Sequence, residues 1–86
     1  MQVPEKKLLE RVKNSNKTSF KDLYYRHQPI LFRYVVYRVR EREIAEDIVQ
    51  ETFVRIWNNR SRLDSSKSFF SLIAKVSNNL CYDHFR

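Results

Sequence analysis

The chain contains no glycine among its 86 residues. Glycine normally supplies the positive φ angles of tight hairpin turns and of phosphate-binding loops, because it has no Cβ. Its absence argues against hairpin-rich folds and excludes Walker-type and Rossmann-type nucleotide sites. Proline occurs only twice, as Pro4 and Pro29. Since long stretches also carry apolar residues at helical spacing, we expect an all-α fold.

The breaks in this spacing predict a compact bundle of about four helices in a single domain, residues 1–86. We expect helices at residues 4–13, 18–40, 44–59 and 68–86, with a polar loop at residues 60–67. Thr18 or Ser19 can cap the second helix. Pro29 lies inside that helix and removes a backbone donor, so we expect one helix with a kink or local break near residues 25–27.

Charge is distributed unevenly along the chain, whose formal net charge is +7. Residues 1–40 sum to +7, residues 41–51 to −4 and residues 52–86 to +4. Basic stretches suit a nucleic-acid backbone, whereas the acidic stretch would be repelled by one. Two partners of different charge are therefore the simpler account. The alternative is that the acids only complement the dipole of the helix that they begin.

The expected third helix has two contrasting sides. On a helical wheel, its core-facing sector holds Ile44, Ala45, Ile48, Val49, Thr52, Phe53 and Ile56. The opposite sector holds a contiguous row, Asp47, Gln50, Val54 and Asn58, with Glu51 in the same sector and Trp57 at its edge. A solvated side would more often carry Lys and Glu pairs. Fixed polar groups around an exposed apolar residue favour a docking surface for a helix of another protein.

The expected fourth helix is also two-sided. Its apolar stripe comprises Phe69, Phe70, Ile73, Val76 and Leu80 and can extend to Phe85. Its polar side holds Lys75, Asn78, Asn79, Tyr82 and Arg86, and the preceding loop adds Arg60, Arg62 and Lys67. Cations for phosphate, amides for base edges and an aromatic ring for stacking favour nucleic-acid contact. The alternative is that these are ordinary solvent-facing residues. Similarly, the second helix carries four tyrosines that could pack at the helix interface or stack on a base, Tyr24, Tyr25, Tyr34 and Tyr37.

Catalysis and metal binding find little support in the sequence. The single cysteine, Cys81, excludes an internal disulfide, and His27 and His84 lie too far apart for a metal-ligand motif. We therefore expect no catalytic residue, no metal and no cofactor. Cys81 is expected to be a small core residue, and Asp83 beside His84 a salt-bridged or solvated pair. No apolar run approaches the roughly 20 residues that span a bilayer, so we expect no membrane insertion.

Three segments of the chain resemble a known family. They are Ala45–Trp57 (AEDIVQETFVRIW), Phe20–Tyr24 (FKDLY) before it and Asn78–Arg86 (NNLCYDHFR) after it. In this order and spacing they closely resemble region two of bacterial RNA polymerase sigma factors of the extracytoplasmic-function (ECF) class. The resemblance covers nearly the whole chain from about Leu8. The first segment is highly specific, and the resemblance implies a cytoplasmic bacterial protein that acts in transcription initiation.

The resemblance also implies two binding surfaces. In such domains the third helix docks on the clamp helices of the largest subunit of the RNA polymerase core, and the matching positions are Asp47, Gln50, Glu51, Val54 and Trp57. The loop and last helix bind mainly the non-template single strand of the minus-ten promoter element and hold a flipped base. The matching positions and loop cations are Arg60, Arg62, Lys67, Ser68, Phe69, Lys75, Asn78, Asn79 and Arg86. Flipping costs a few kcal/mol of stacking, which the pocket and the backbone cations must recover.

Some positions depart from the family pattern. Leu72 stands where many members have tryptophan, Ser77 and Asn78 replace the usual small and basic pair, and the loop lacks the common glycine. These departures leave the target promoter open. The resemblance further implies an anti-sigma partner and a second helical domain, so we expect this chain to be a fragment of a two-domain regulator. The alternative is a stand-alone helical module without initiation activity that binds DNA or an anti-sigma protein. If it is a small helix-turn-helix DNA-binding protein, it should prefer duplex DNA to single strands.

Overall fold

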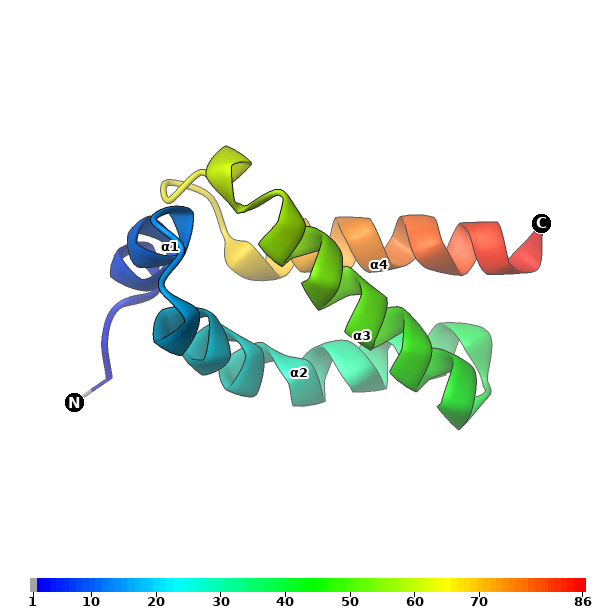
Figure 1. The fold of residues 1–86 in the computed structure, drawn as a ribbon. Helices are drawn as coiled ribbons and strands as arrows, with labels where there is room; N and C mark the ends of the chain where they lie inside the picture. Colours follow the sequence, from blue (N-terminus) through cyan, green and yellow to red (C-terminus); the bar gives the residue numbers. More distant parts are fainter. Residues whose placement is uncertain (1) are drawn as a thin grey trace.

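The computed structural model describes residues 2–86 and is all-α over that range. Its elements are α1 (Glu5–Lys13), α2 (Lys17–Val39), α3 (Arg42–Asn58), the short 3-10 helix η1 (Arg60–Arg62) and α4 (Phe69–Phe85) (Figure 1). The predicted bundle of about four helices is confirmed.

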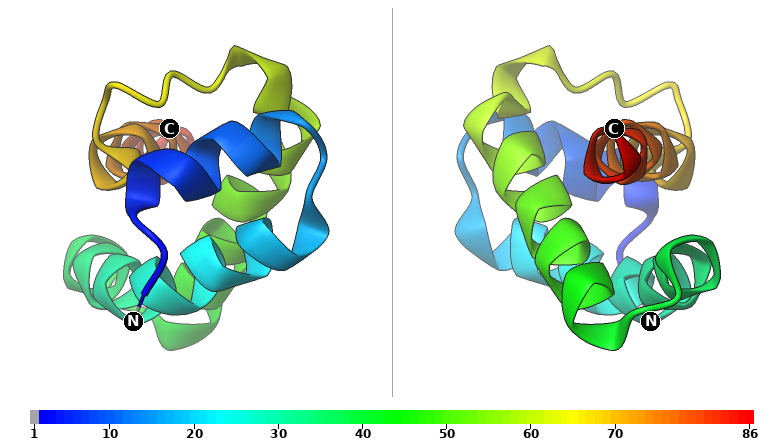
Figure 2. Two further views of the ribbon diagram at one scale, coloured as in Figure 1. Left: turned by 90° about the vertical axis from the view of Figure 1, so that its left-hand side faces the viewer. Right: turned by 90° about the vertical axis from the view of Figure 1, so that its right-hand side faces the viewer.

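Helix α2 contacts the other three α-helices, and α3 also packs against α4. Figure 1 shows α3 crossing α2 and α4, while α1 closes one end of the molecule beside the segment that precedes α4. Figure 2 shows the same arrangement from its two ends, with α1 in front in one view and the end of α4 in front in the other. The C-terminal end of α4 therefore lies far from α1.

The starts of two helices differ from the prediction. The cap of α2 is Asn16 instead of Thr18 or Ser19, because its side chain accepts a hydrogen bond from the backbone N–H of Ser19. Helix α3 begins at Arg42, two residues early, since the turn from α2 needs only two residues. Arg40 makes this turn with φ of 60°, a conformation that glycine usually supplies.

Helix α2 is unbroken across Pro29. A local break near residues 25–27 is therefore absent, and the prediction of one long helix is confirmed. Figure 2 shows the two halves of α2 running in different directions, in agreement with the alternative prediction of a kink. Pro29 lies on an exposed part of the helix. The carbonyl of Tyr25, which loses its helical donor, belongs to a residue that is itself exposed, so water can replace the missing bond.

The core is built mainly from the residues that helical spacing predicts. On α3 every member of the predicted sector is buried except the half-buried Ile44. On α4 the buried line is Phe69, Ile73, Ser77 and Cys81. Cys81 is thus a core residue as predicted, whereas Phe85, the next position on this line, is 63% exposed because the line extends beyond the packed part of α2 and α3. Leu63, in the predicted polar loop, is also buried.

Candidate functional site

The predicted row on α3 faces solvent. Asp47, Gln50, Val54, Asn58 and the adjacent Glu51 are all exposed. The other side of the helix is fixed in the core, where even the hydroxyl of Thr52 is satisfied by donating to the carbonyl of Ile48 at 2.8 Å. Within residues 2–86, the side chains of Asp47, Gln50 and Asn58 make no hydrogen bond or ion pair. The row therefore offers uncommitted polar groups on a rigid support.

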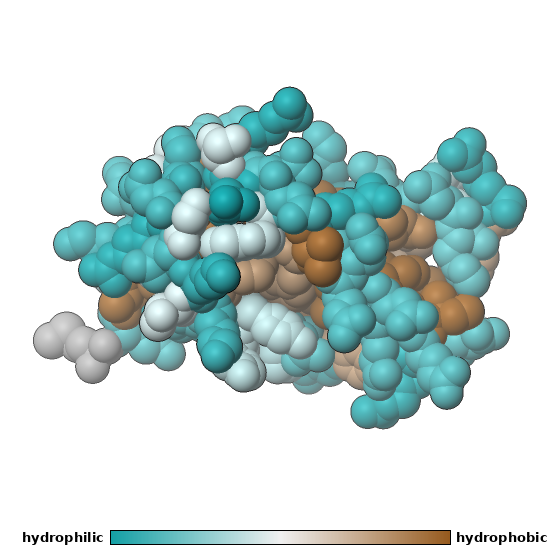
Figure 3. All heavy atoms as spheres, in the orientation of Figure 1, coloured by the Kyte–Doolittle hydropathy of each residue, from teal (hydrophilic) through white to brown (hydrophobic). Residues whose placement is uncertain are grey.

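An apolar groove of about 530 Å³ runs beside this row, between α2 and α3. Its floor is an aromatic cluster in which the ring centroid of Phe20 lies 5.2 Å from that of Trp57 and 6.2 Å from that of Phe53. The lining comprises Lys17, Phe20, Lys21, Tyr24, Gln50, Phe53, Val54 and Trp57. Figure 3 shows apolar and near-neutral side chains along the middle of this face, bordered by hydrophilic ones.

The sequence predicted only the α3 wall of the groove. The helical wheel of α3 placed Val54 in the exposed row and Trp57 at its edge, but it gave no indication that α2 supplies the opposite wall. The available signal was the spacing of Phe20 and Tyr24, four residues apart and therefore on one side of their helix.

The end of α3 is braced by Arg60. Its guanidinium lies 4.3 Å from the centroid of the Trp57 ring, donates from Nη1 to the carbonyl of Trp57 and donates from Nε to Ser15 Oγ at 2.8 Å. Arg60 was predicted as a DNA-binding cation, and in the structure its guanidinium is engaged within the fold. Arg62 and Lys67, the other two predicted loop cations, are exposed.

The loop before α4 is held in shape by local hydrogen bonds. Asp64 Oδ1 accepts from both the hydroxyl and the backbone N–H of Ser66, at 2.6 and 2.9 Å. These bonds favour the carboxylate, so the Ser66 hydroxyl and then its N–H lower the pKa of Asp64 below its ordinary value. At the end of the loop, Ser68 Oγ accepts from the backbone N–H of Ser71 and caps α4.

Glu5 of α1 fixes the start of α4. Its Oε2 accepts from the backbone N–H of Phe69 at 3.1 Å, and its Oε1 lies 3.0 Å from Nε2 of His27. Phe69 itself is 1% exposed, and its ring packs against the His27 ring. The side chain of Phe69, predicted among the DNA-binding residues, is therefore a core element that anchors the loop. Sequence reasoning missed Glu5, because its partners lie 22 and 64 residues away.

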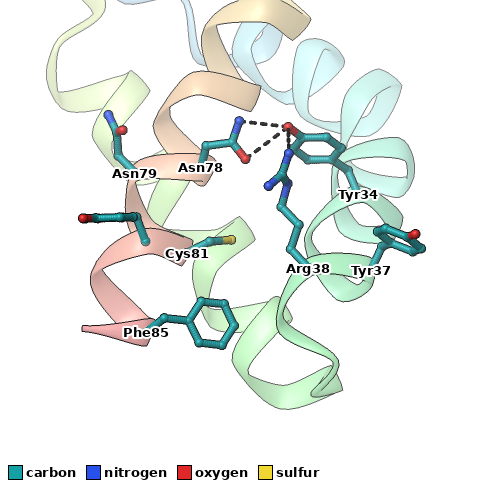
Figure 4. A pocket seen from close by; sticks show the side chains of 8 residues that line it. Tyr34, Tyr37, Arg38, Asn78, Asn79, Cys81 and Phe85 are labelled. Atoms are coloured by element: carbon teal, nitrogen blue, oxygen red, sulfur yellow. Dashed lines mark hydrogen bonds between the residues drawn. The ribbon is translucent and has the colours of Figure 1, made fainter.

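The predicted polar strip of α4 is exposed at Lys75, Asn79, Tyr82 and Arg86. Asn78 is half-buried, and its amide is hydrogen bonded to the hydroxyl of Tyr34 on α2 (Figure 4). The carboxylate of Asp83 pairs with Arg86 at 3.1 Å, so a salt bridge is present but its partner is not His84. The exposed residues of this strip continue into the loop, where they are joined by Arg62, Lys67 and Ser68.

Neither a membrane span nor a metal cluster emerges from this geometry. Across residues 2–86, each helix is too short or too polar to cross a bilayer. Over the same residues, His, Cys, Asp and Glu side chains form no group of three that could hold a metal ion. The geometry presents two candidate surfaces: an apolar groove bordered by the row of α3 and by Lys17 and Lys21 of α2, and a basic, polar surface on the loop and α4.

Comparison with known proteins identifies the family. The family model described as Sigma-70 region 2 matches residues 23–86. The chain is 28% identical to RNA polymerase sigma factor CarQ of Myxococcus xanthus over 91% of its length, and 30% identical to ECF RNA polymerase sigma factor BldN of Streptomyces coelicolor over 92%. It is 26% identical over its full length to ECF RNA polymerase sigma factor SigW of Bacillus subtilis.

The match covers only part of each relative. The chain spans 45% of CarQ, 30% of BldN and 46% of SigW. No solved structure matches the chain significantly. Since the family model covers well over half of the chain, the chain belongs to the Sigma-70 region 2 family, and two of these three relatives are named as ECF sigma factors.

Proposed function

We propose that this chain is the part of an ECF sigma factor that docks on the clamp helices of RNA polymerase and captures unpaired minus-ten promoter DNA during transcription initiation. The observation that carries the proposal is the exposed row of α3 beside the aromatic groove. Family membership supplies the class of partner, and the geometry of the two surfaces supports the division of labour.

The α3 surface suits a helical protein partner. Asp47 and Gln50 are free to bond to groups on a partner, and they project from a helix whose other side is held in the core. Beside them, Val54 is 50% exposed and Trp57 lines the groove, so an apolar anchor of the partner can be buried there. Tryptophan is among the residues most enriched in interface hot spots, which cluster in desolvated pockets. A groove between two helices fits one helix of a coiled coil.

The loop and α4 suit a nucleic-acid strand. Arg62, Lys67, Lys75 and Arg86 are exposed along one continuous stretch and can follow successive phosphates. Asn79 can hydrogen bond a base edge. The loop is anchored at both ends, by buried Leu63 and Phe69, so a base can enter without the loop having to be ordered first.

A second protein partner would compete for the α3 surface. An anti-sigma protein that inserts an apolar helix into the groove would cover Val54 and Trp57 and prevent docking on polymerase. The two partners are therefore expected to exclude each other. Adding an anti-sigma fragment to a preformed complex with the clamp helices should displace the chain.

The test is binding of the chain to a purified fragment of the polymerase largest subunit that carries the clamp helices. Asp47→Ala and Gln50→Ala are expected to weaken binding by about 1 to 3 kcal/mol, because each leaves a polar group of the partner unpaired. Glu10→Ala is the matched control, since it removes an exposed carboxylate from α1, away from the groove. Circular dichroism establishes that all three variants fold.

Three outcomes would contradict the proposal. Absence of wild-type binding at millimolar concentration would remove polymerase docking from the function of this chain. Wild-type binding that Asp47→Ala and Gln50→Ala leave unchanged would show that a different surface docks. Equal weakening by Glu10→Ala would indicate general charge attraction.

A further inference from the structure

A second hollow borders the proposed DNA surface, shares Asn79 and Tyr82 with it, and has its other wall on α2, outside both proposed surfaces. It is an open crevice of about 900 Å³ between the C-terminal halves of α2 and α4. Figure 4 shows Arg38 reaching up from α2 and the ring of Phe85 extending from α4 toward α2, with Cys81 between them. The lining comprises Tyr34, Tyr37, Arg38, Asn78, Asn79, Cys81, Tyr82 and Phe85.

One end of the crevice is fixed by the Tyr34 hydroxyl. It donates to Asn78 Oδ1 at 3.1 Å, accepts from Asn78 Nδ2 at 2.8 Å and accepts from Arg38 Nη2 at 2.9 Å. A phenol has one donor and two acceptor positions, so its hydrogen-bonding capacity is filled. The guanidinium of Arg38 also lies over the Tyr34 ring, 4.7 Å from its centroid. Arg38 is thereby held in place, with its remaining N–H groups available to a ligand.

The crevice is cationic and aromatic at the same time. Burial raises the pKa of the Cys81 thiol, and the positive charge of Arg38 acts on it in the opposite direction, which places that charge beside α4. The rim rings of Tyr37, Tyr82 and Phe85 are 77%, 67% and 63% exposed. No carboxylate belongs to the lining, all of which falls within residues 2–86.

Arginines also flank the rim. Arg40 lies over the ring of Tyr37 and Arg86 over that of Tyr82, at 5.8 and 5.5 Å from the centroids. Guanidinium groups interleaved with exposed rings are typical of surfaces that bind single-stranded nucleic acid, where cations contact phosphates and rings stack on bases. An apolar helix would have to bury Arg38 and Arg40, for which the described residues 2–86 supply no carboxylate partner, and burying an unpaired charge is costly.

We propose that this crevice binds one unpaired nucleotide of the DNA strand that runs along α4. Arg38 contacts its phosphate, and the ring of Phe85 stacks on its base. The inference rests on the proposed function and extends the DNA surface from α4 onto α2. It also assigns Asn78 a role in holding the crevice together with Tyr34.

The experiment measures binding of the whole chain to a fluorescent single-stranded oligonucleotide of about 12 nucleotides over a series of salt concentrations, a length within the span contacted by single-strand-binding folds. Arg38→Gln is expected to weaken binding at least about fivefold and to reduce the slope of log affinity against log salt by about 0.7, the value for one phosphate contact to a single strand. Phe85→Leu is expected to weaken binding to a similar degree with an unchanged slope, because a ring carries no charge.

Two controls separate the crevice from the rest of the surface. Arg33→Gln removes the same charge from an exposed position of α2 that does not line the crevice, and it should leave the salt slope unchanged. Lys75→Gln reports on the α4 surface of the proposed function. If Lys75→Gln weakens binding and Arg38→Gln does not, the crevice proposal is overturned while the proposed function stands.

Other results would also overturn the proposal. Equal effects of Arg38→Gln and Arg33→Gln would indicate only long-range charge attraction. Binding to the duplex form of the same oligonucleotide with equal affinity would contradict a site for an unpaired nucleotide, as would equal competition by a glutamate-rich peptide. No wild-type binding to either DNA form would overturn both this inference and the DNA half of the proposed function, whereas binding to the clamp helices would still be measurable.

Discussion

The exposed sides of α3 and α4 are built in opposite ways. The polar row of α3 carries side chains that make no bonds within the described part of the chain, whereas several polar residues of the loop and α4 are already bonded. Asn78 is bonded to Tyr34, Arg60 to Ser15 and Arg86 to Asp83. The α3 side is suited to a preformed partner that supplies the missing bonds. The α4 side is suited to a flexible strand that must be held by groups already in position.

The largest expected effect comes from damaging the core that supports both sides, because both kinds of binding should then weaken. Ile73 is 0% exposed and lies on the buried line of α4. Ile73→Ala is expected to lower the free energy of unfolding by about 2 to 5 kcal/mol, because it leaves a cavity. Urea unfolding gives the change, and binding to the clamp helices and to single-stranded DNA should fall together. A loss below about 1 kcal/mol would contradict the assigned packing of α4.

A substitution in the middle of the α3 row should affect one side only. Val54→Lys places a charge where the proposed partner buries an apolar group, so binding to the clamp helices is expected to weaken by about 2 kcal/mol or more. Because Val54 is 50% exposed, the free energy of unfolding should change by less than about 0.5 kcal/mol. Titration calorimetry and urea unfolding measure the two quantities. Undiminished binding would mean that the partner does not cover Val54.

The anchor of α4 offers the converse test. Glu5→Ala leaves the N–H of Phe69 and the ring of His27 without their acceptor. The free energy of unfolding is expected to fall by about 1 to 2 kcal/mol. The loss should lie toward the low end of this range, because Glu5 is partly exposed. DNA affinity should fall because the loop is less well held, while binding to the clamp helices should persist. Glu10→Ala, on the same helix, is the control. If DNA affinity is unchanged although stability falls, Glu5 does not position the loop.

The smallest expected effect concerns the pH dependence of the loop. The hydrogen bonds from Ser66 lower the pKa of Asp64 in the folded chain. They therefore stabilise the loop fully when the pH is above the ordinary pKa of Asp64, and this stabilisation is lost as the pH falls through the lowered pKa of the folded chain. The amide resonance of Ser66 should stay constant from neutral pH down to about pH 4 and shift only below it. Asp64→Asn keeps an acceptor oxygen and should abolish the shift. A titration of Asp64 above its ordinary value would contradict the bonded turn.

Most of the fold could be predicted because its signals are local. The spacing of apolar residues on α1 and α3 identifies both the helices and their buried sides. The errors lie where tertiary packing decides. Phe85 continues the apolar spacing of α4 but extends beyond its packing partners, and Leu63 is apolar within a polar segment, where no periodicity identifies it as buried.

The candidate surfaces were predictable to the extent that each lies on a single helix. The row of Asp47, Gln50 and Val54 follows from one helical wheel. The groove beside it, the anchor at Glu5 and the crevice at Arg38 each combine side chains from different helices. The hydrogen bond between Tyr34 and Asn78 joins residues 44 positions apart, and no spacing rule relates them. For Phe69 the two sources differed: helical spacing placed it in the apolar stripe, the family resemblance placed it in the DNA set, and packing buries it.

The most direct test of the account measures both ligands on the same two variants. Asp47→Ala represents the α3 side and Lys75→Gln the α4 side, and each is assayed against the clamp helices and against single-stranded DNA. The account predicts that Asp47→Ala loses binding to the clamp helices and keeps DNA affinity, while Lys75→Gln does the reverse. If either variant weakens both ligands equally while remaining folded, the two sides are not separate binding surfaces and the central claim is wrong.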